Sequence, residues 1–299
     1  MDSVVEGEAK GSNLGQRVIL PASFIGGPRD MKRRYVDAMS LVQKYGKPDL
    51  FLTMTCNPSW PEIKKNMLPI NESQNRVDLS ARVFHAKLEL LKEELFKKEI
   101  FGKVAAYTYV VEFQKRGLPH AHFLIILHPT SKLYSTESYD QIVSAELPDP
   151  VEQKHLFKMV RKHMMHCPCG DKKPDNVCMQ GTTTKKCKNK YPKDWAEKTL
   201  HGENSYPTYR RRNNGRKVFV RGHELDNRWV VPYNAYLLAK FNCHINVEIC
   251  STIKVVKYTY KYIDKGHDKI HFFVNSEAKS FEIDEIKEYQ AVRWVFSIE

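Results

Sequence analysis

The sequence predicts an α+β fold with a central antiparallel sheet, flanking helices and a Cys/His-rich insertion. Apolar residues recur at helical spacing from about Val77 to Lys98, which indicates one long amphipathic helix. Two runs rich in β-branched and aromatic residues follow, Lys103 to Phe113 and His120 to His128, with the turn-like KRGLP between them. They predict a hairpin, and the four cysteines clustered beyond it lie where regular periodicity disappears.

The other expected elements are read from periodicity and from Gly and Pro breakers. Residues 1–14 are expected to be a flexible lead, and 15–299 a single domain whose insertion spans 160–205. The helices are expected at Arg29 to Lys44, in two pieces between Thr136 and His166 around Pro148 and Pro150, and at Ala235 to Phe241. The further strands are expected at Phe51 to Cys56, in RKVFVRG and in HINVEIC.

Composition points to a nucleic-acid partner. The 299 residues carry a formal net charge of +13, and Lys and Arg that neutralise phosphates release counterions from nucleic acid. The 41% hydrophobic content argues against disorder, and the absence of a membrane-length apolar run or an apolar signal-peptide core argues against a membrane partner or secretion. Clustered cysteines favour metal binding in a reducing compartment over disulfides.

The PHAHFLIIL segment places two histidines on one face of a strand. His120 and His122 are two residues apart, so their imidazoles point the same way. Glu112 comes from the strand opposite, with Gln114 as the alternative, and nitrogen plus oxygen ligands suit Mg²⁺ or Mn²⁺. A structural histidine pair and a solvated Glu112 are the competing interpretation.

The KYTYKYIDK segment combines tyrosines with lysines. As a helix, it would place Tyr258 and Tyr262 on one face, beside a row formed by Lys257, Lys261 and Lys265. As a strand, which local propensity favours, the segment would place Tyr258, Tyr260 and Tyr262 on one face. Nearby cations would help a phenol to ionise and could hold DNA phosphates, whereas core packing is the ordinary role of such tyrosines.

The HMMHCPCG segment opens a group of possible zinc ligands. The candidates are His163, His166, Cys167, Cys169, Cys178 and Cys187. Their spacing is not that of a standard CxxC pair, so free buried thiols are the alternative. Downstream, the triplet Arg210, Arg211 and Arg212 belongs to a basic stretch interleaved with aromatic residues, which suits single-stranded nucleic acid as well as a solvated surface.

Taken in order, several blocks of the sequence resemble the Helitron helicase-like N-terminal domain. The blocks are LPASFIGGPRDM, GKPDLFLTMTCNPSWPEI, VVEFQKRGLPHAHFLIIL, the cysteine segment, VVPYNAYLLAKFNCHINVEIC and VKYTYKYIDKG. The family belongs to the HUH endonucleases of rolling-circle transposases, so the resemblance implies a five-stranded antiparallel sheet, a ferredoxin- or RRM-like palm, with a helix that carries the nucleophilic tyrosines.

Residue by residue, the resemblance assigns His120 and His122 to the catalytic Mg²⁺ or Mn²⁺, with Glu112 inferred as third ligand, and Tyr258 and Tyr262 to the nucleophiles of the KYxxKYxxK pattern. Because Cys167 stands where the family commonly has Gly, the preferred zinc ligands are the following four residues. They are His166, Cys169, Cys178 and Cys187.

The implied activity is nicking and joining of single-stranded DNA through a 5′-phosphotyrosine, in the nucleus. No GxxxxGK[ST] phosphate loop occurs, so helicase activity is expected from another part of the protein or from a partner. The chain is expected to be a fragment or a degenerate copy. A catalytically decayed, zinc-containing protein that only binds single strands is the alternative function, and a metal nuclease that uses water is a third.

Overall fold

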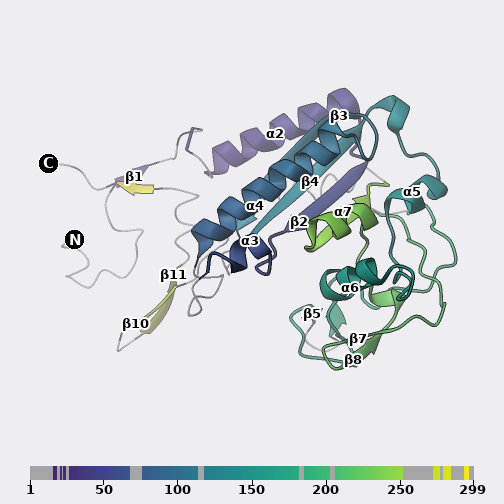
Figure 1. Cartoon of the computed structure of the whole chain (residues 1–299). Coiled ribbons are helices and arrows are strands. Elements are labelled where there is room, and N and C mark those ends of the chain that lie inside the picture. Colours follow the sequence, from purple (N-terminus) through teal and green to yellow (C-terminus); the bar gives the residue numbers. More distant parts are fainter. Residues whose placement is uncertain are drawn as a thin grey trace. The chain divides into compact units, whose positions relative to one another are not determined.

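The computed structural model describes most of the chain between residues 16 and 295 (Figure 1). The described residues are 16–18, 21, 23–24, 27–67, 76–113, 118–181, 185–202, 206–251, 272–276, 279–283 and 293–295. They fall into two compact units, one from Val42 to Tyr258 and one formed by the two ends of the chain. The larger unit contains both candidate metal centres.

The larger unit is built on an antiparallel sheet. Among the described residues it has four strands in the order β3-β4-β2-β9, where five were expected from the family resemblance. The strands are β2 (Leu50–Thr55), β3 (Val104–Phe113), β4 (Pro119–Leu127) and β9 (Ile245–Ile249). β2 and β4 are the central strands, so backbone hydrogen bonds on both sides hold each of them.

One face of the sheet is apolar because every second residue of the central strands is hydrophobic. Leu52, Phe123 and Val247 are in register on this face, and all three are inaccessible to solvent. The helix α4 (Val77–Lys92) contacts β4 and buries Phe84, Leu88 and Leu91. This packing leaves the opposite face of the sheet to carry the polar residues described below.

Four shorter helices complete the α-helical part of this unit, within the described residues. They are α3 (Pro61–Lys64), α5 (Thr136–Ile142), α6 (Lys154–His163) and α7 (Ala235–Phe241). α7 begins at Asn234, whose side-chain oxygen accepts a hydrogen bond from the Leu237 N–H, and ends at Asn242 in the left-handed conformation. Trp60 donates its indole N–H to the Phe241 carbonyl, which ties the end of α7 to the α3 segment.

A long excursion of the chain separates β4 from α7. It includes α5, α6 and two small hairpins, β5 (Met179–Gln180) with β6 (Lys186–Cys187) and β7 (Val218–Val220) with β8 (His223–Leu225). Short 3-10 turns lie at Pro129–Ser131 and Asn227–Trp229. Ser144 and Tyr233 exchange both backbone hydrogen bonds, at 2.8 and 2.9 Å, so most of the excursion leaves and returns at one place.

The smaller unit contains two antiparallel strand pairs and most of α2 (Pro28–Tyr45). β1 (Gln16–Val18) pairs with β12 (Arg293–Val295), which joins the two ends of the chain. β10 (Phe272–Ser276) forms a hairpin with β11 (Lys279–Ile283).

The expected α+β class is confirmed, as are the predicted hairpin and the Cys/His cluster. The long predicted helix differs in its last turn, because α4 passes into a π-helix, η3 (Glu93–Lys97). In that turn Glu94 is buried although it is charged, and it pairs with Lys98 and Lys240. Periodicity alone does not reveal such a change of helix type.

Candidate metal centres

The polar face of the sheet brings together three of the predicted metal ligands. In the antiparallel register Glu112 on β3 lies opposite His120 on β4, and His122 follows two residues later on the same face. All three side chains are half-buried. The strand alternation expected from the sequence therefore places one carboxylate and two imidazoles side by side.

The geometry of the three side chains is compatible with a shared cation. The rings of His120 and His122 are nearly parallel, with planes 5° apart and centroids separated by 6.4 Å. The Nε2 atom of His122 lies 3.8 Å from Oε2 of Glu112. Phe51 stacks on the other side of His122 at 5.8 Å, which restricts the rotation of that ring.

Two threonines of β2 complete this arrangement, and the sequence analysis did not identify them. The Oγ1 atom of Thr53 lies 2.9 Å from Nδ1 of His122, and Oγ1 of Thr55 lies 2.8 Å from Nδ1 of His120. Each threonine faces its histidine in the β2–β4 register. The only sequence signal was the Thr-x-Thr spacing in FLTMTC. Its relation to the two histidines becomes visible only when the pairing of β2 with β4 is known.

The donor set fits a divalent cation that prefers mixed nitrogen and oxygen ligands. Nδ1 of each histidine lies within hydrogen-bond distance of a threonine, so Nε2 is the ring nitrogen that could bind a cation, and the Glu112 carboxylate adds oxygen and negative charge. Such a set leaves coordination positions for water or substrate, as Mg²⁺ and Mn²⁺ sites commonly do. The sheet thus carries residues that could hold such a cation.

Several predicted site residues lie outside the described part of the chain. They are Gln114, Lys257, Tyr258, Tyr260, Lys261, Tyr262 and Lys265. The choice between Glu112 and Gln114 as third ligand is therefore a prediction for which only Glu112 has a described position.

The second candidate centre lies in the excursion between β4 and α7. The ligand atoms of His166, Cys169, Cys178 and Cys187 all lie within 4.8 Å of one another. A tetrahedral zinc site requires separations of about 3.5–3.8 Å, from Zn–S bonds of about 2.3 Å and Zn–N bonds of about 2.0 Å. The contact between Cys187 Sγ and His166 Nε2, at 3.4 Å, is already of that size. This cluster could bind a metal such as zinc.

Loops and one short hairpin position these four ligands. Cys178 immediately precedes β5, and Cys187 ends β6, so the hairpin presents both sulfurs at its base. Cys169 precedes Gly170, whose φ of +64° is accessible to glycine at little cost and turns the chain after the ligand. His166 is fixed by stacking on Tyr191, with ring centroids 4.1 Å apart.

The electrostatics of the cluster favour a bound cation. Burial, with a smaller effect of Lys193 and Lys188, lowers the pKa of His166 to about 4, so the ring is neutral and its nitrogen can ligate. Burial also raises the pKa of the Cys169 and Cys178 thiols, because crowded thiolates without a counter-charge are unfavourable. A divalent cation would offset that cost and stabilise the thiolates.

Two other candidates from the HMMHCPCG segment are placed elsewhere. Nε2 of His163 lies 2.8 Å from Oδ1 of Asn242, at the end of α7, and the ring is therefore used to join α6 to α7. Cys167 is half-buried and is not part of the four-residue cluster. The preference for the set without these two residues agrees with the observed geometry.

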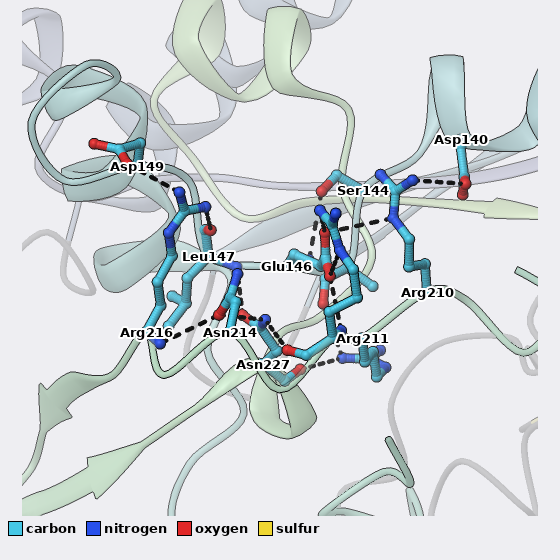
Figure 2. A network of polar contacts seen from close by, with 12 residues as sticks. Asp140, Ser144, Glu146, Leu147, Asp149, Arg210, Arg211, Asn214, Arg216 and Asn227 are labelled. Carbon is cyan, nitrogen blue, oxygen red and sulfur yellow. Dashed lines mark hydrogen bonds and ion pairs between the residues drawn. The ribbon is translucent and has the colours of Figure 1, made fainter. Parts of the chain in front are cut away.

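The arginine triplet takes part in a network of polar contacts, in which Figure 2 shows Arg210 and Arg211. Arg211 is 4% exposed, and its guanidinium donates to the carbonyls of Ala145, Asn227 and Val230. The three hydrogen bonds use the Arg211 side chain to hold backbone groups of the protein. This position disagrees with the expectation that Arg211 contacts DNA.

The flanking arginines are partly exposed but paired with acids. Arg212 makes a bidentate contact with Glu146, at 2.7 and 3.0 Å, and Arg210 lies 3.3 Å from Asp140. Although burial opposes ionisation of Glu146, hydrogen bonds from Arg212 lower its pKa. Arg216 pairs in the same way with Asp149 at 2.9 Å. The basic stretch therefore presents less free positive charge than its sequence indicates.

Comparison with known proteins identifies one matching family. The family model described as the Helitron helicase-like domain at the N-terminus matches residues 1–125. The match confirms the resemblance over these residues, which include Glu112, His120 and His122 but neither the cysteine cluster nor the tyrosine segment. No curated protein matches the chain. In the described part of the chain, no helix is long and apolar enough to cross a membrane.

Proposed function

We propose that the chain is a Helitron-type Rep endonuclease and strand transferase that cuts and joins single-stranded DNA through a phosphotyrosine intermediate. The observation that carries the proposal is the convergence of His120, His122 and Glu112 on one face of the sheet. The family match adds support because it spans these three residues.

The arrangement of the elements is consistent with the palm of such an enzyme. The chain runs β2, α4, β3, β4, α7 and β9, with the excursion inserted before α7, and the strands lie in the order β3-β4-β2-β9. This is the strand–helix–strand–strand–helix–strand pattern of split βαβ folds. We infer an HUH-type palm in which the histidine strand is central.

The proposed reaction is a transesterification. The phenolate of Tyr258 or Tyr262 attacks the phosphorus of a DNA phosphodiester, which forms the tyrosine O–P bond and breaks the bond from phosphorus to the 3′ oxygen. The leaving oxygen takes up a proton and becomes a 3′-hydroxyl, while the 5′ phosphate stays on the enzyme. Lys261 lies between the tyrosines in sequence, and a neighbouring cation lowers the cost of ionising a phenol.

The residues of the sheet would hold the scissile phosphate in position. His120 and His122 through Nε2, and Glu112 through its carboxylate, would hold Mg²⁺ or Mn²⁺. When bound, the cation supplies Lewis-acid polarisation of the phosphate. Release of the intermediate by attack of a 3′-hydroxyl reverses the first step, so a second tyrosine permits two strands to be exchanged in sequence.

The remaining roles belong to the cysteine cluster and the basic residues. We propose that His166, Cys169, Cys178 and Cys187 hold a structural zinc ion, because a set with four protein ligands leaves no position for substrate. Lys257 and Lys265, with the exposed sides of Arg210 and Arg212, are proposed to contact DNA phosphates. Arg211 instead stabilises the protein interior. Unwinding would come from a helicase domain, and the site of action would be the nucleus.

The proposal is tested by covalent capture. The protein is incubated with a labelled single-stranded oligonucleotide and Mn²⁺, and an SDS-resistant protein–DNA adduct is measured. We expect an adduct with the wild type and none with the double variant Tyr258→Phe and Tyr262→Phe. The matched control is Tyr260→Phe, which removes a phenol from the same segment and is expected to retain the adduct.

Each other outcome points to a different function. Cleavage without an adduct would indicate a metal nuclease that uses water. Salt-sensitive binding of single strands without cleavage would indicate a catalytically decayed binding protein. Persistence of the adduct in the double variant would reject the tyrosine assignment.

A further inference from the structure

Thr53 and Thr55 form a row that parallels the two histidines. The two threonines lie two residues apart on β2, and each faces the histidine that is its register partner on β4. The two oxygen-to-nitrogen distances are 2.9 and 2.8 Å, and both contacts reach the same ring atom, Nδ1. The same Oγ1–Nδ1 contact thus occurs twice, two residues apart along the strands, once for each histidine ring.

The chemistry of imidazole gives this contact a consequence. A neutral histidine that ligates a metal through Nε2 must carry its proton on Nδ1, and the group that accepts this proton selects the tautomer and the ring orientation. A threonine hydroxyl can accept that hydrogen bond. The nearly parallel planes of the two rings, 5° apart, are what two equivalent contacts from one strand would produce.

We propose that Thr53 and Thr55 are positioning residues that hold His122 and His120 with Nε2 directed at the metal. The proposal rests on the proposed metal site and goes beyond it, because it assigns to β2 the control of ligand geometry. Neither threonine contacts the metal or the DNA in this scheme. Their effect passes through the Nδ1 hydrogen bonds.

The test replaces each threonine by valine. Valine keeps the branched shape and the strand preference of threonine but removes the hydrogen-bond acceptor. We expect Thr53→Val and Thr55→Val each to weaken Mn²⁺ binding, measured by calorimetry, by about 10–100-fold, the usual effect of losing an outer partner of a ligand histidine. Thr53→Ser and Thr55→Ser, which keep the hydroxyl, should restore most of the affinity.

A matched control is available on the same face of the sheet. Thr108 on β3 faces Leu124 rather than a histidine. Thr108→Val is therefore the same chemical change in the same sheet, and it should leave Mn²⁺ binding unchanged. Equal loss of binding in this variant would assign the effect to general weakening of the sheet and overturn the proposal.

A second measurement does not depend on metal or on DNA cleavage. Nitrogen NMR correlation spectra of the imidazoles, at mildly alkaline pH without metal, report which ring nitrogen carries the proton. We expect the Nδ1–H form for both histidines, and a shift toward Nε2–H only in the histidine that faces the replaced threonine. Unchanged tautomers in both valine variants would overturn the proposal, even if the wild type forms the DNA adduct. Tautomers that shift as expected would support it, even if no adduct forms.

Discussion

The two candidate metal centres are built from different kinds of backbone. The His120, His122 and Glu112 centre lies on two regular strands inside a sheet, where hydrogen bonding on both sides of β4 fixes each Cα position. The His166, Cys169, Cys178 and Cys187 centre is assembled from loops and a two-residue hairpin, and three of its four ligands are buried. The three ligand side chains of the first centre are half-buried.

This difference in backbone indicates at which centre a bound metal would contribute to folding. At the sheet centre, strand pairing and the Thr53 and Thr55 contacts place the candidate ligands on regular backbone. The loop centre lies outside the sheet, on turns and a two-residue hairpin, and there the binding free energy of an ion would add to the folding free energy. We expect metal loss to be a catalytic defect at one centre and a structural defect at the other.

The largest effect is expected from Cys178→Ser. Loss of one thiolate ligand should remove stoichiometric zinc and destabilise the surrounding loops by more than the roughly 0.5–3 kcal/mol of most substitutions, because metal loss is among the causes of unusually large effects. Elemental analysis and thermal denaturation would measure the two effects. Cys167→Ser is the control, since Cys167 lies outside the cluster and its replacement should leave zinc and stability unchanged. Wild-type zinc content in Cys178→Ser would refute the structural-zinc assignment.

A smaller and purely local effect is expected from Glu112→Gln. Removing the carboxylate charge should weaken Mn²⁺ binding at least about tenfold, or roughly 1.4 kcal/mol, because hard divalent cations prefer charged oxygen. Thermal stability and zinc content should stay close to those of the wild type, because strand pairing does not use this side chain. Glu89→Gln, on the exposed side of α4, is the charge-matched control. If Glu112→Gln lost zinc as well, the two centres would not be independent.

The smallest effect concerns the contact between η3 and α7. Glu94 on η3 pairs with Lys240 and Lys98 and accepts a hydrogen bond from Tyr236, so it connects η3 to α7. The Lys240 and Lys98 contacts lower the pKa of Glu94 to about 2, against 4.5 for an unperturbed group. Because the folded-state pKa is depressed, the stabilisation is complete above pH 4.5 and is lost as the pH falls toward 2.

The variant Glu94→Gln should therefore have a lower free energy of unfolding than the wild type at neutral pH. This difference should shrink as the pH is lowered. Chemical denaturation at several pH values between these limits would measure it. A gap that does not depend on pH would mean that the carboxylate charge contributes nothing there, and that only packing distinguishes the two side chains.

Much of the fold could be predicted, because local patterns determine local structure. The period of α4 and the alternation in β4 follow directly from the spacing of apolar residues. The position of Glu112 across from the two histidines also followed from the predicted hairpin. These features require nothing beyond neighbouring segments of the chain.

The features that sequence reasoning missed depend on contacts between distant residues. Thr53 becomes a partner of His122 only through a strand pairing that spans 69 positions. Arg211 is buried because carbonyls from two separate segments surround its guanidinium, whereas its place in a basic stretch had indicated contact with nucleic acid. The position of a polar side chain in the tertiary structure, rather than its type, decides its role in both cases.

The closed path of the excursion has a consequence for how the molecule can change. Because Ser144 and Tyr233 pair with each other, a segment of almost ninety positions begins and ends at one point beside the sheet. Inside the segment, the Tyr209 hydroxyl adds a further contact with the sheet by accepting a hydrogen bond from the Ile249 N–H of β9. Such a segment behaves as a cassette: it can be lengthened, shortened or exchanged in the course of evolution while the strand order, and with it the histidine face, is preserved.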